Sequence, residues 1–260
     1  MSPLTGRTGA LDWSDVNPDA GVTTLLVHSL GTNRSMWHDQ VAVLGGNRRV
    51  IAVDLPGHGG SSALPGPYTV DDLGGGILDV VTACGVERFE VVGISLGGLI
   101  ALWLAVNAPD RVDALVACNT AGRLGSEELW SGRIEAVEAG GMEPIRENVV
   151  RRFFAPDFER LQPVEFERYN EIFSATDPVG YAGCCAALRD GDLTGEVGSI
   201  RCPTLVIGGD RDIATPPEQS TTLHQAISGS RLEIIEGAAH LSNLDRPQQF
   251  NRVLAEFLSV

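Results

Sequence analysis

Residues 89–102 read Phe-Glu-Val-Val-Gly-Ile-Ser-Leu-Gly-Gly-Leu-Ile-Ala-Leu. A β-branched run comes first, then Gly93-Ile94-Ser95-Leu96-Gly97, and then an apolar run of helical composition. A strand, a G-x-S-x-G turn and a helix in this order predict a nucleophile elbow, which holds a serine hydroxyl clear of the surrounding packing. The sequence therefore predicts Ser95 as a nucleophile. The alternative is an ordinary serine in a glycine-rich turn.

Two backbone amides are expected to face the Ser95 hydroxyl. The Leu96 N–H stands at the start of the predicted helix, where amides lack helical partners. The second is expected from the loop His28-Ser29-Leu30-Gly31, because a loop after an earlier strand completes the oxyanion hole behind such an elbow. Leu30 and Leu96 are the predicted donors. The alternative for residues 28–31 is an ordinary strand-to-helix loop.

Composition narrows the class of protein. A chain of 260 residues that is 43% hydrophobic suits one large α/β domain with room for an insertion. A formal net charge of −15 argues against nucleic-acid and acidic-membrane partners, because both would be repelled. The five cysteines are odd in number and lack metal-like spacing, which favours reduced thiols in a cytoplasmic protein. Neither a signal peptide nor a membrane span is predicted.

The order of elements predicts an α/β fold with a mostly parallel, doubly wound sheet. Apolar strands alternate with helices, which requires right-handed crossovers between parallel strands. Residues 1–21 are expected to be irregular, with at most a short edge strand at 11–14. Strands are expected at 23–27, 50–54, 89–92, 114–118, 204–207 and 232–235, and helices at 36–44, 69–84 and 247–258. A further helix is expected after Gly97, and residues 108–111 should end it.

The alternation stops between residues 122 and 197, where no strand is evident. Amphipathic helices are expected there, centred on 130–139, 144–154, 163–176 and 178–190. We interpret 122–197 as a helical cap over the carboxyl end of the sheet, inserted in an α/β core of 1–121 and 198–260.

Ser95, Asp212 and His240 each follow a predicted strand, so a parallel sheet brings them to one edge. Their chain order is that of a Ser-Asp-His triad on such a sheet. His240 would take the serine proton, and Asp212 would orient the imidazole. Asp210 lies closer to its strand and is the alternative acid, but Asp212 has the usual spacing.

Asp54 and His58 also invite a catalytic pairing. They belong to the loop Asp-Leu-Pro-Gly-His-Gly-Gly-Ser at 54–61, and loops of this composition usually shape the sheet edge. We therefore assign both residues structural roles.

Several segments carry a family resemblance. The broad signals are 54–61, 93–98, 209–212 and 237–240; the narrower ones are 29–32, 36–37, 66–68, 99–103, 118–121, 141–142 and above all 180–193. On these segments the chain resembles the α/β-hydrolase superfamily and, more closely, the 3-oxoadipate enol-lactonases of aromatic catabolism. Its start before Thr23 looks shorter than the two-stranded opening usual in that fold.

The resemblance implies a substrate and a reaction. The substrate would be 3-oxoadipate enol-lactone, a small lactone with a free carboxylate. Ser95 would attack the ring carbonyl while Leu30 and Leu96 hold the oxyanion, and His240 would activate water for hydrolysis of the acyl-enzyme. No metal or organic cofactor is implied.

A carboxylate-bearing substrate needs a cationic partner in so acidic a protein. The predicted cap offers Arg133, Arg151, Arg152 and Arg189. Arg133 is preferred because it lies about one helical turn from Trp130, a plausible apolar wall.

Two other functions compete with the lactonase. One is a small-ester carboxylesterase or perhydrolase-like enzyme with the same three residues. The other is a catalytically silent binding protein, against which the complete Ser95, Asp212 and His240 set argues.

Overall fold

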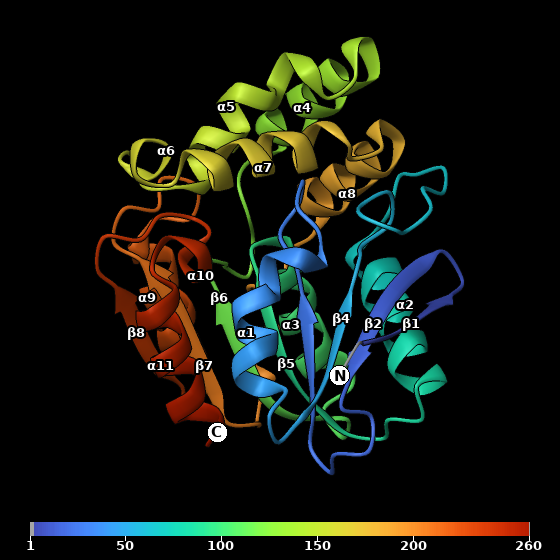
Figure 1. The fold of residues 1–260 in the computed structure, drawn as a ribbon, viewed down its shortest axis with the longest axis vertical. Coiled ribbons are helices and arrows are strands. Elements are labelled where there is room, and N and C mark those ends of the chain that lie inside the picture. The colour runs from blue at the N-terminus through green and yellow to red at the C-terminus, as the bar shows by residue number, and fades with distance from the viewer. Residues whose placement is uncertain (1–2, 260) are drawn as a thin grey trace.

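A computed structural model describes residues 3–259 of the chain. One eight-stranded sheet crosses the molecule in the order β1-β2-β4-β3-β5-β6-β7-β8 (Figure 1). Strands β3 to β8 pair in parallel, and β2 joins β4 antiparallel. The predicted fold class is therefore confirmed. The strands are β1 (Leu4–Thr8), β2 (Leu11–Val16), β3 (Thr23–Val27), β4 (Arg49–Val53), β5 (Phe89–Ile94), β6 (Val112–Cys118), β7 (Thr204–Gly209) and β8 (Arg231–Ile235).

Helices cover both faces of the sheet. The helices α1 and α11 pack together on one face, and α2, α3 and α9 lie on the other (Figure 1). The central strands are consequently buried on both sides: every residue of β3 is buried, as the apolar composition predicted. These helices are α1 (His38–Leu44), α2 (Val70–Ala83), α3 (Leu96–Asn107), α9 (Pro217–Ala226) and α11 (Pro247–Leu258), with the short helices η1 (Arg34–Trp37), η2 (Val197–Ser199) and α10 (Ser242–Asp245).

Five helices between β6 and β7 lie over one end of the sheet (Figure 1). We call them the cap helices: α4 (Glu127–Gly140), α5 (Glu143–Phe153), α6 (Phe158–Leu161), α7 (Pro163–Ser174) and α8 (Pro178–Asp190). They rest on loops that follow β3 and β4. A Cβ on Gly57 would meet the Gly180 backbone at 2.6 Å, and one on Gly31 would meet the Phe173 ring at 2.7 Å. The cap helices therefore close over the carboxyl ends of the strands.

The expectation for the N-terminus was wrong. Instead of an irregular segment with a shortened opening, β1 and β2 form an antiparallel hairpin at the sheet edge. Gly9 makes the turn with φ +57, which glycine adopts without strain. Gly6 pairs with Trp13, and a Cβ there would meet the indole at 2.2 Å. Gly6 and Gly9 therefore permit the hairpin rather than interrupt it.

A capping box begins α2. The Thr69 side chain accepts from the Asp72 N–H, and the Asp72 carboxylate accepts from the Thr69 N–H. Gly74 is explained by packing, because a Cβ there would meet Trp103 at 2.1 Å. A Cβ on Gly75 would meet nothing within 4 Å, so no packing reason accounts for that glycine.

Candidate active site

The predicted elbow is present between β5 and α3. Ser95 sits at the helix N-cap with φ +59 and ψ −118, a conformation that costs a non-glycine residue energy. Its N–H donates to the Cys118 carbonyl, and its carbonyl accepts from Thr120 Oγ1, so both sides of the turn are anchored to β6 and the residues after it. The side chain remains only 8% exposed. This turn aims Ser95 into the space beneath the cap helices.

His240 and Asp212 are brought together from the ends of β8 and β7. His240 Nδ1 lies 2.9 Å from Asp212 Oδ2. The other carboxylate oxygen accepts the Ala214 and Thr215 N–H groups at 2.8 and 2.9 Å. Burial acts to raise the pKa of Asp212, but the His240 charge and hydrogen bond and the Thr215 donors outweigh it and lower that pKa to about 2. An ionised Asp212 accepts the Nδ1 proton and leaves Nε2 as the basic nitrogen.

Asp210, the alternative acid, is engaged elsewhere. Its carboxylate accepts the Gly237 N–H at 2.6 Å, which ties the loop after β7 to the loop after β8. Ser95 and His240 face the same cavity. Among residues 3–259 the Ser95 hydroxyl has no hydrogen-bond partner, so it is free to interact with a substrate in this cavity.

Asn119 supports the acid–base pair, and sequence reasoning gave it no role. Its Nδ2 donates to Asp212 Oδ2 at 2.9 Å and to the Ala239 carbonyl at 3.1 Å. Ser242 Oγ donates to Asn119 Oδ1 at 2.6 Å, which fixes the orientation of the amide. The available signal was a polar residue directly after the β6 strand, at the edge where Ser95 and Asp212 were expected.

The predicted oxyanion donors lie where the elbow needs them. Leu30 lines the cavity and Leu96 is the first residue of α3. Over the described part of the chain, neither N–H donates to a protein acceptor. Their positions suit an acyl oxygen near Ser95.

Two buried histidines hold the loops behind Leu30. His58 Nε2 accepts the Gly31 N–H at 3.0 Å, and His28 Nε2 accepts the Leu55 N–H at 2.9 Å. Burial lowers the pKa of His28 to about 4 and that of His58 to about 3, so both are neutral near pH 7. Asp54 accepts from Arg34 and from the Gly60 N–H. His58 and Asp54 therefore have the structural roles assigned from sequence.

The cavity around Ser95 and His240 has apolar walls and two guanidinium groups. Arg133 Cζ lies 4.9 Å from the centre of the Trp130 ring, and its Nη1 donates to Tyr181 Oη at 3.3 Å. Arg152 donates to the Ile213 carbonyl at 3.4 Å. Burial and the neighbouring Arg133 charge lower the pKa of Arg152. The apolar lining comes from the side chains of Leu124, Leu129, Trp130, Val149 and Phe153.

The four arginines offered by the cap fall into two classes. Arg151 pairs with Glu147 and Glu159, and Arg189 pairs with Asp190. Arg133 and Arg152 have no carboxylate within 4.0 Å among residues 3–259, and both line the cavity. An anion can therefore bind there without displacing an existing ion pair.

Within 3–259, no group of three or more His, Cys, Asp and Glu side chains is arranged to hold a metal ion. Over the same residues, no helix combines the length and the apolar character needed to cross a membrane.

Comparison with known proteins identifies the family. The family model described as the alpha/beta hydrolase fold matches residues 24–247. The chain belongs to the α/β hydrolase family. The hydrolase is 34% identical over 251 residues to 3-oxoadipate enol-lactonase 2 of Acinetobacter baylyi, covering 96% of this chain and 94% of that protein. The crystal structure of the enol-lactonase from Burkholderia xenovorans LB400 superposes with a TM-score of 0.94 at 34% identity, covering 99% of this chain and all of that one.

Other relatives of the hydrolase act on open-chain esters. A pimeloyl-[acyl-carrier protein] methyl ester esterase of Neisseria meningitidis is 30% identical over 250 residues, with 93% of this chain and 94% of that protein covered. Lactones and methyl esters are both carboxylic esters. This α/β hydrolase is a carboxylic-ester hydrolase, and the resemblance to enol-lactonases found in its sequence is confirmed.

Proposed function

We propose that this hydrolase opens 3-oxoadipate enol-lactone to 3-oxoadipate through an acyl-enzyme on Ser95. The observation that carries the proposal is the pair Arg133 and Arg152, which line the cavity without carboxylate partners. In a chain of net charge −15, such a pair suits a small anionic substrate rather than a neutral one. The enol-lactonase relatives support the same substrate.

The first half of the reaction forms the acyl-enzyme. Ser95 Oγ attacks the lactone carbonyl carbon as its proton passes to His240 Nε2, while Asp212 stabilises the imidazolium. The Leu30 and Leu96 N–H groups receive the developing oxyanion. When the carbonyl re-forms, the ring C–O bond breaks and its electron pair leaves with the enol oxygen. An enolate is a better leaving group than an ordinary alkoxide, so this step needs little assistance.

The second half releases the product. The enolate takes the proton from His240 and becomes the ketone, and the neutral imidazole then removes a proton from water as it attacks the acyl carbon. The leaving group stays tethered in the acyl-enzyme, so hydrolysis competes with ring closure. Conversion of the enolate to the ketone removes the nucleophile that would reclose the ring.

The arginines give the test of the substrate class. Arg133→Ala and Arg152→Ala should each raise KM for the anionic lactone roughly tenfold or more, since hydrogen bonds to charged groups contribute about 1.5–3 kcal/mol. KM for neutral p-nitrophenyl acetate should change little. Arg151→Ala is the matched control, because Arg151 already pairs with two glutamates outside the cavity. Equal increases in KM for both substrates would contradict the proposal that these arginines bind the substrate carboxylate.

A general small-ester esterase is the second candidate, favoured by the apolar walls from Leu124, Val149 and Phe153 and by the methyl ester esterase relative. Wild type and Ser95→Ala should be compared on the lactone and on p-nitrophenyl acetate. A kcat/KM much higher on the lactone, and abolished in the variant, supports the lactonase. Activity on the acetate alone would keep Ser95 as nucleophile and discard the lactone.

A further inference from the structure

The Asp245 carboxylate joins two parts of the active site from behind. It is 6% exposed, at the end of α10. Its Oδ2 accepts the Ala239 N–H at 2.7 Å, and its two oxygens accept the Ala155 N–H at 3.1 and 3.0 Å. Ala239 directly precedes His240, and Ala155 follows α5 by two residues. The Asp245 side chain thus contacts both the loop that carries His240 and the segment directly after α5.

A second contact links the same two segments. The Leu241 N–H donates to the Phe153 carbonyl at 2.8 Å. Phe153 and its neighbour Arg152 both line the cavity. The segments on either side of His240 are therefore bonded to the end of α5, one directly and one through Asp245.

We propose that Asp245 is a positioning residue, whose ionised carboxylate holds the His240 loop and the end of α5 in catalytic register. The proposal rests on the proposed function of Ser95 and His240. The ionised carboxylate presents two charged acceptor oxygens to the Ala239 and Ala155 N–H groups. Protonation removes that charge and turns one oxygen into a donor, which weakens the hydrogen bonds to both N–H groups. Protonation of Asp245 therefore loosens both segments at once.

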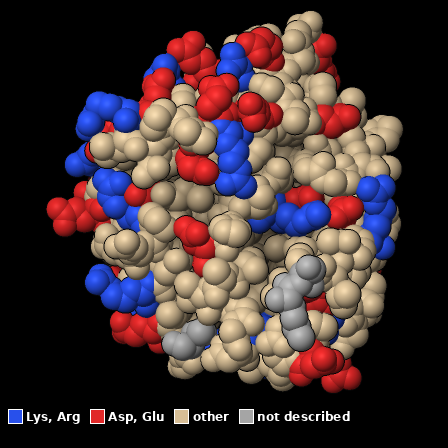
Figure 2. Space-filling model, viewed as in Figure 1, with Lys and Arg blue, Asp and Glu red and all other residues tan. Residues whose placement is uncertain are grey.

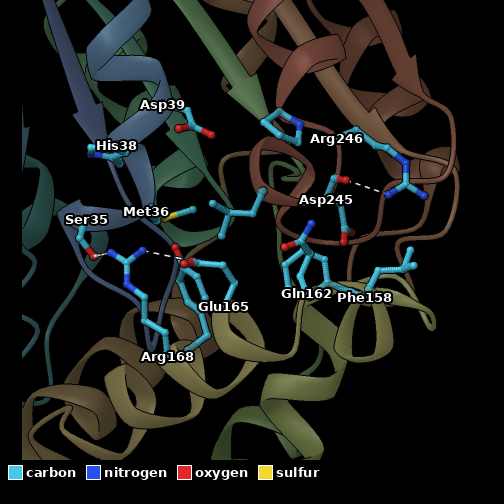
Figure 3. A pocket seen from close by; sticks show the side chains of 14 residues that line it. Ser35, Met36, His38, Asp39, Phe158, Gln162, Glu165, Arg168, Asp245 and Arg246 are labelled. Carbon is cyan, nitrogen blue, oxygen red and sulfur yellow. Dashed lines mark hydrogen bonds and ion pairs between the residues drawn. The ribbon is translucent and has the colours of Figure 1, made fainter.

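Asp245 lines a cavity other than the one that Ser95 lines. A cavity of about 370 Å³ lies between η1, α7 and the start of α11, and Asp245 and Arg246 line it (Figure 3). Burial raises the pKa of Asp245 to about 6, against the opposing effect of the Ala239 and Ala155 N–H groups and of Arg246, and the Asp157 charge raises it further. The other charged or titratable side chains on this cavity are His38, Asp39, Glu165, Arg168 and Tyr169, of which Glu165 and Arg168 pair with each other (Figure 3).

The acid side of the pH profile gives the test. If catalysis requires an ionised Asp245 in addition to the single deprotonation that general-base catalysis itself requires, log kcat/KM of the wild type for p-nitrophenyl acetate falls toward acid with a slope approaching two. Asp245→Asn should show a slope of one, and kcat near pH 7 should drop on the order of tenfold to a hundredfold because the base loop shifts. A slope of two retained in Asp245→Asn would overturn the proposal.

Two neighbouring charges test the same idea without changing Asp245. Asp157→Asn removes a charge that raises the pKa of Asp245, so the acid limb should move to lower pH; Arg246→Gln should move it to higher pH. Both shifts should disappear in the Asp245→Asn background if they act through Asp245. Shifts that persist there, or no shift in either single variant, contradict the proposal, and these single variants keep it testable if Asp245→Asn does not fold.

The two proposals fail in different ways. Undiminished ester hydrolysis by Ser95→Ala would remove the proposed function and leave the pH profiles to another nucleophile. Loss of activity in Ser95→Ala together with unchanged profiles in the Asp157 and Arg246 variants would remove only the role of Asp245. Circular dichroism and thermal melts establish that each variant is folded.

Discussion

In the proposed acid–base pair of Asp212 and His240, contacts beyond the hydrogen bond between the two residues hold each partner in place. Asp212 accepts three N–H groups and a hydroxyl besides His240, which keeps its pKa low and its charge in place. Asn119 links that carboxylate to the Ala239 carbonyl, next to the base. The imidazole is therefore oriented through its Nδ1 and through the backbone that carries it.

Removal of the Asn119 amide should lower kcat while leaving KM nearly unchanged. Asn119 has φ +45, so glycine is the substitution that removes the side chain without adding backbone strain. We expect Asn119→Gly to lose on the order of tenfold in kcat, because Asp212 loses a donor and the Ala239 carbonyl is freed. Steady-state kinetics on p-nitrophenyl acetate measures both constants. A change confined to KM would contradict this role.

The positions of Ser95, Asp212 and His240 at one edge of the sheet could be predicted, and the residues that support them could not. Ser95, Asp212 and His240 stand at strand ends in a known chain order, so position alone selected them. Asn119 and Asp245 act through side-chain contacts spanning 93 residues in one case and 90 in the other, and no local spacing encodes such contacts. Likewise, sequence could offer Arg152 only as one of four candidates, because ion pairing is a three-dimensional property.

At the scale of elements, the elbow depends on the closeness of β5 and α3. A Cβ on Gly93 would lie 2.0 Å from the Gly97 carbonyl oxygen, and one on Gly97 would lie 2.1 Å from the Val27 carbonyl oxygen. These neighbours are backbone atoms that cannot rotate away. The strand-to-helix turn therefore tolerates no side chain at either position.

Two glycine-to-alanine variants should shift stability in opposite directions. Gly93→Ala should destabilise the fold by about 3 kcal/mol or more, or prevent folding, because the elbow must open. Gly75→Ala, in the interior of α2 with open space around it, should stabilise by about 0.5–1 kcal/mol. Urea unfolding measures both. Equal changes in the free energy of unfolding would mean that the close backbone contacts at Gly93 do not determine what the alanine costs.

Elements with strong periodicity were predictable, and the hairpin at the edge was not. Strand β3 and helix α11 have the predicted bounds, since a buried β-branched and apolar strand and an amphipathic helix that begins with a proline carry their signal locally. In the β1–β2 hairpin, Gly6 is required by Trp13 on the opposite strand, and a single-sequence pattern does not contain that pairing. Four of the five cap helices were expected; the short helix α6 and the packing order of the cap helices were not.

At the scale of the molecule, the negative charge is dispersed. On the face drawn in Figure 2, acidic and basic side chains are interspersed and neither kind forms a continuous patch. Anions are therefore not drawn to this face as a whole, and attraction has to come from groups close to Ser95. The two arginines that line the Ser95 cavity can provide this local attraction in an otherwise acidic protein.

Stability should fall as the pH falls below about 6.5. His28 and His58 have lowered pKa values in the folded state, so the unfolded chain binds more protons and gains from acidification. Asp245 has a raised pKa and acts in the opposite direction below about pH 6, but it is one group against two. By about pH 4.5 we expect a net loss on the order of 3 kcal/mol.

Urea unfolding near pH 7 and near pH 4.5 measures this loss. His58→Gln should reduce the dependence on pH, whereas His38→Gln, at an exposed position, should leave it unchanged. A free energy of unfolding that is flat or rises toward acid would show that the buried histidines do not govern it.

The antiparallel start of the chain also decides where the protein can be attached to something else. Leu4 pairs with Asp15, toward the amino-terminal end of β4, and α11 runs to Leu258 at that same end, opposite the cap helices (Figure 1). Both chain ends thus leave the molecule on the side away from the Ser95 cavity. A fusion partner, an affinity tag or an immobilising linker can be placed at either terminus while the substrate entrance stays open.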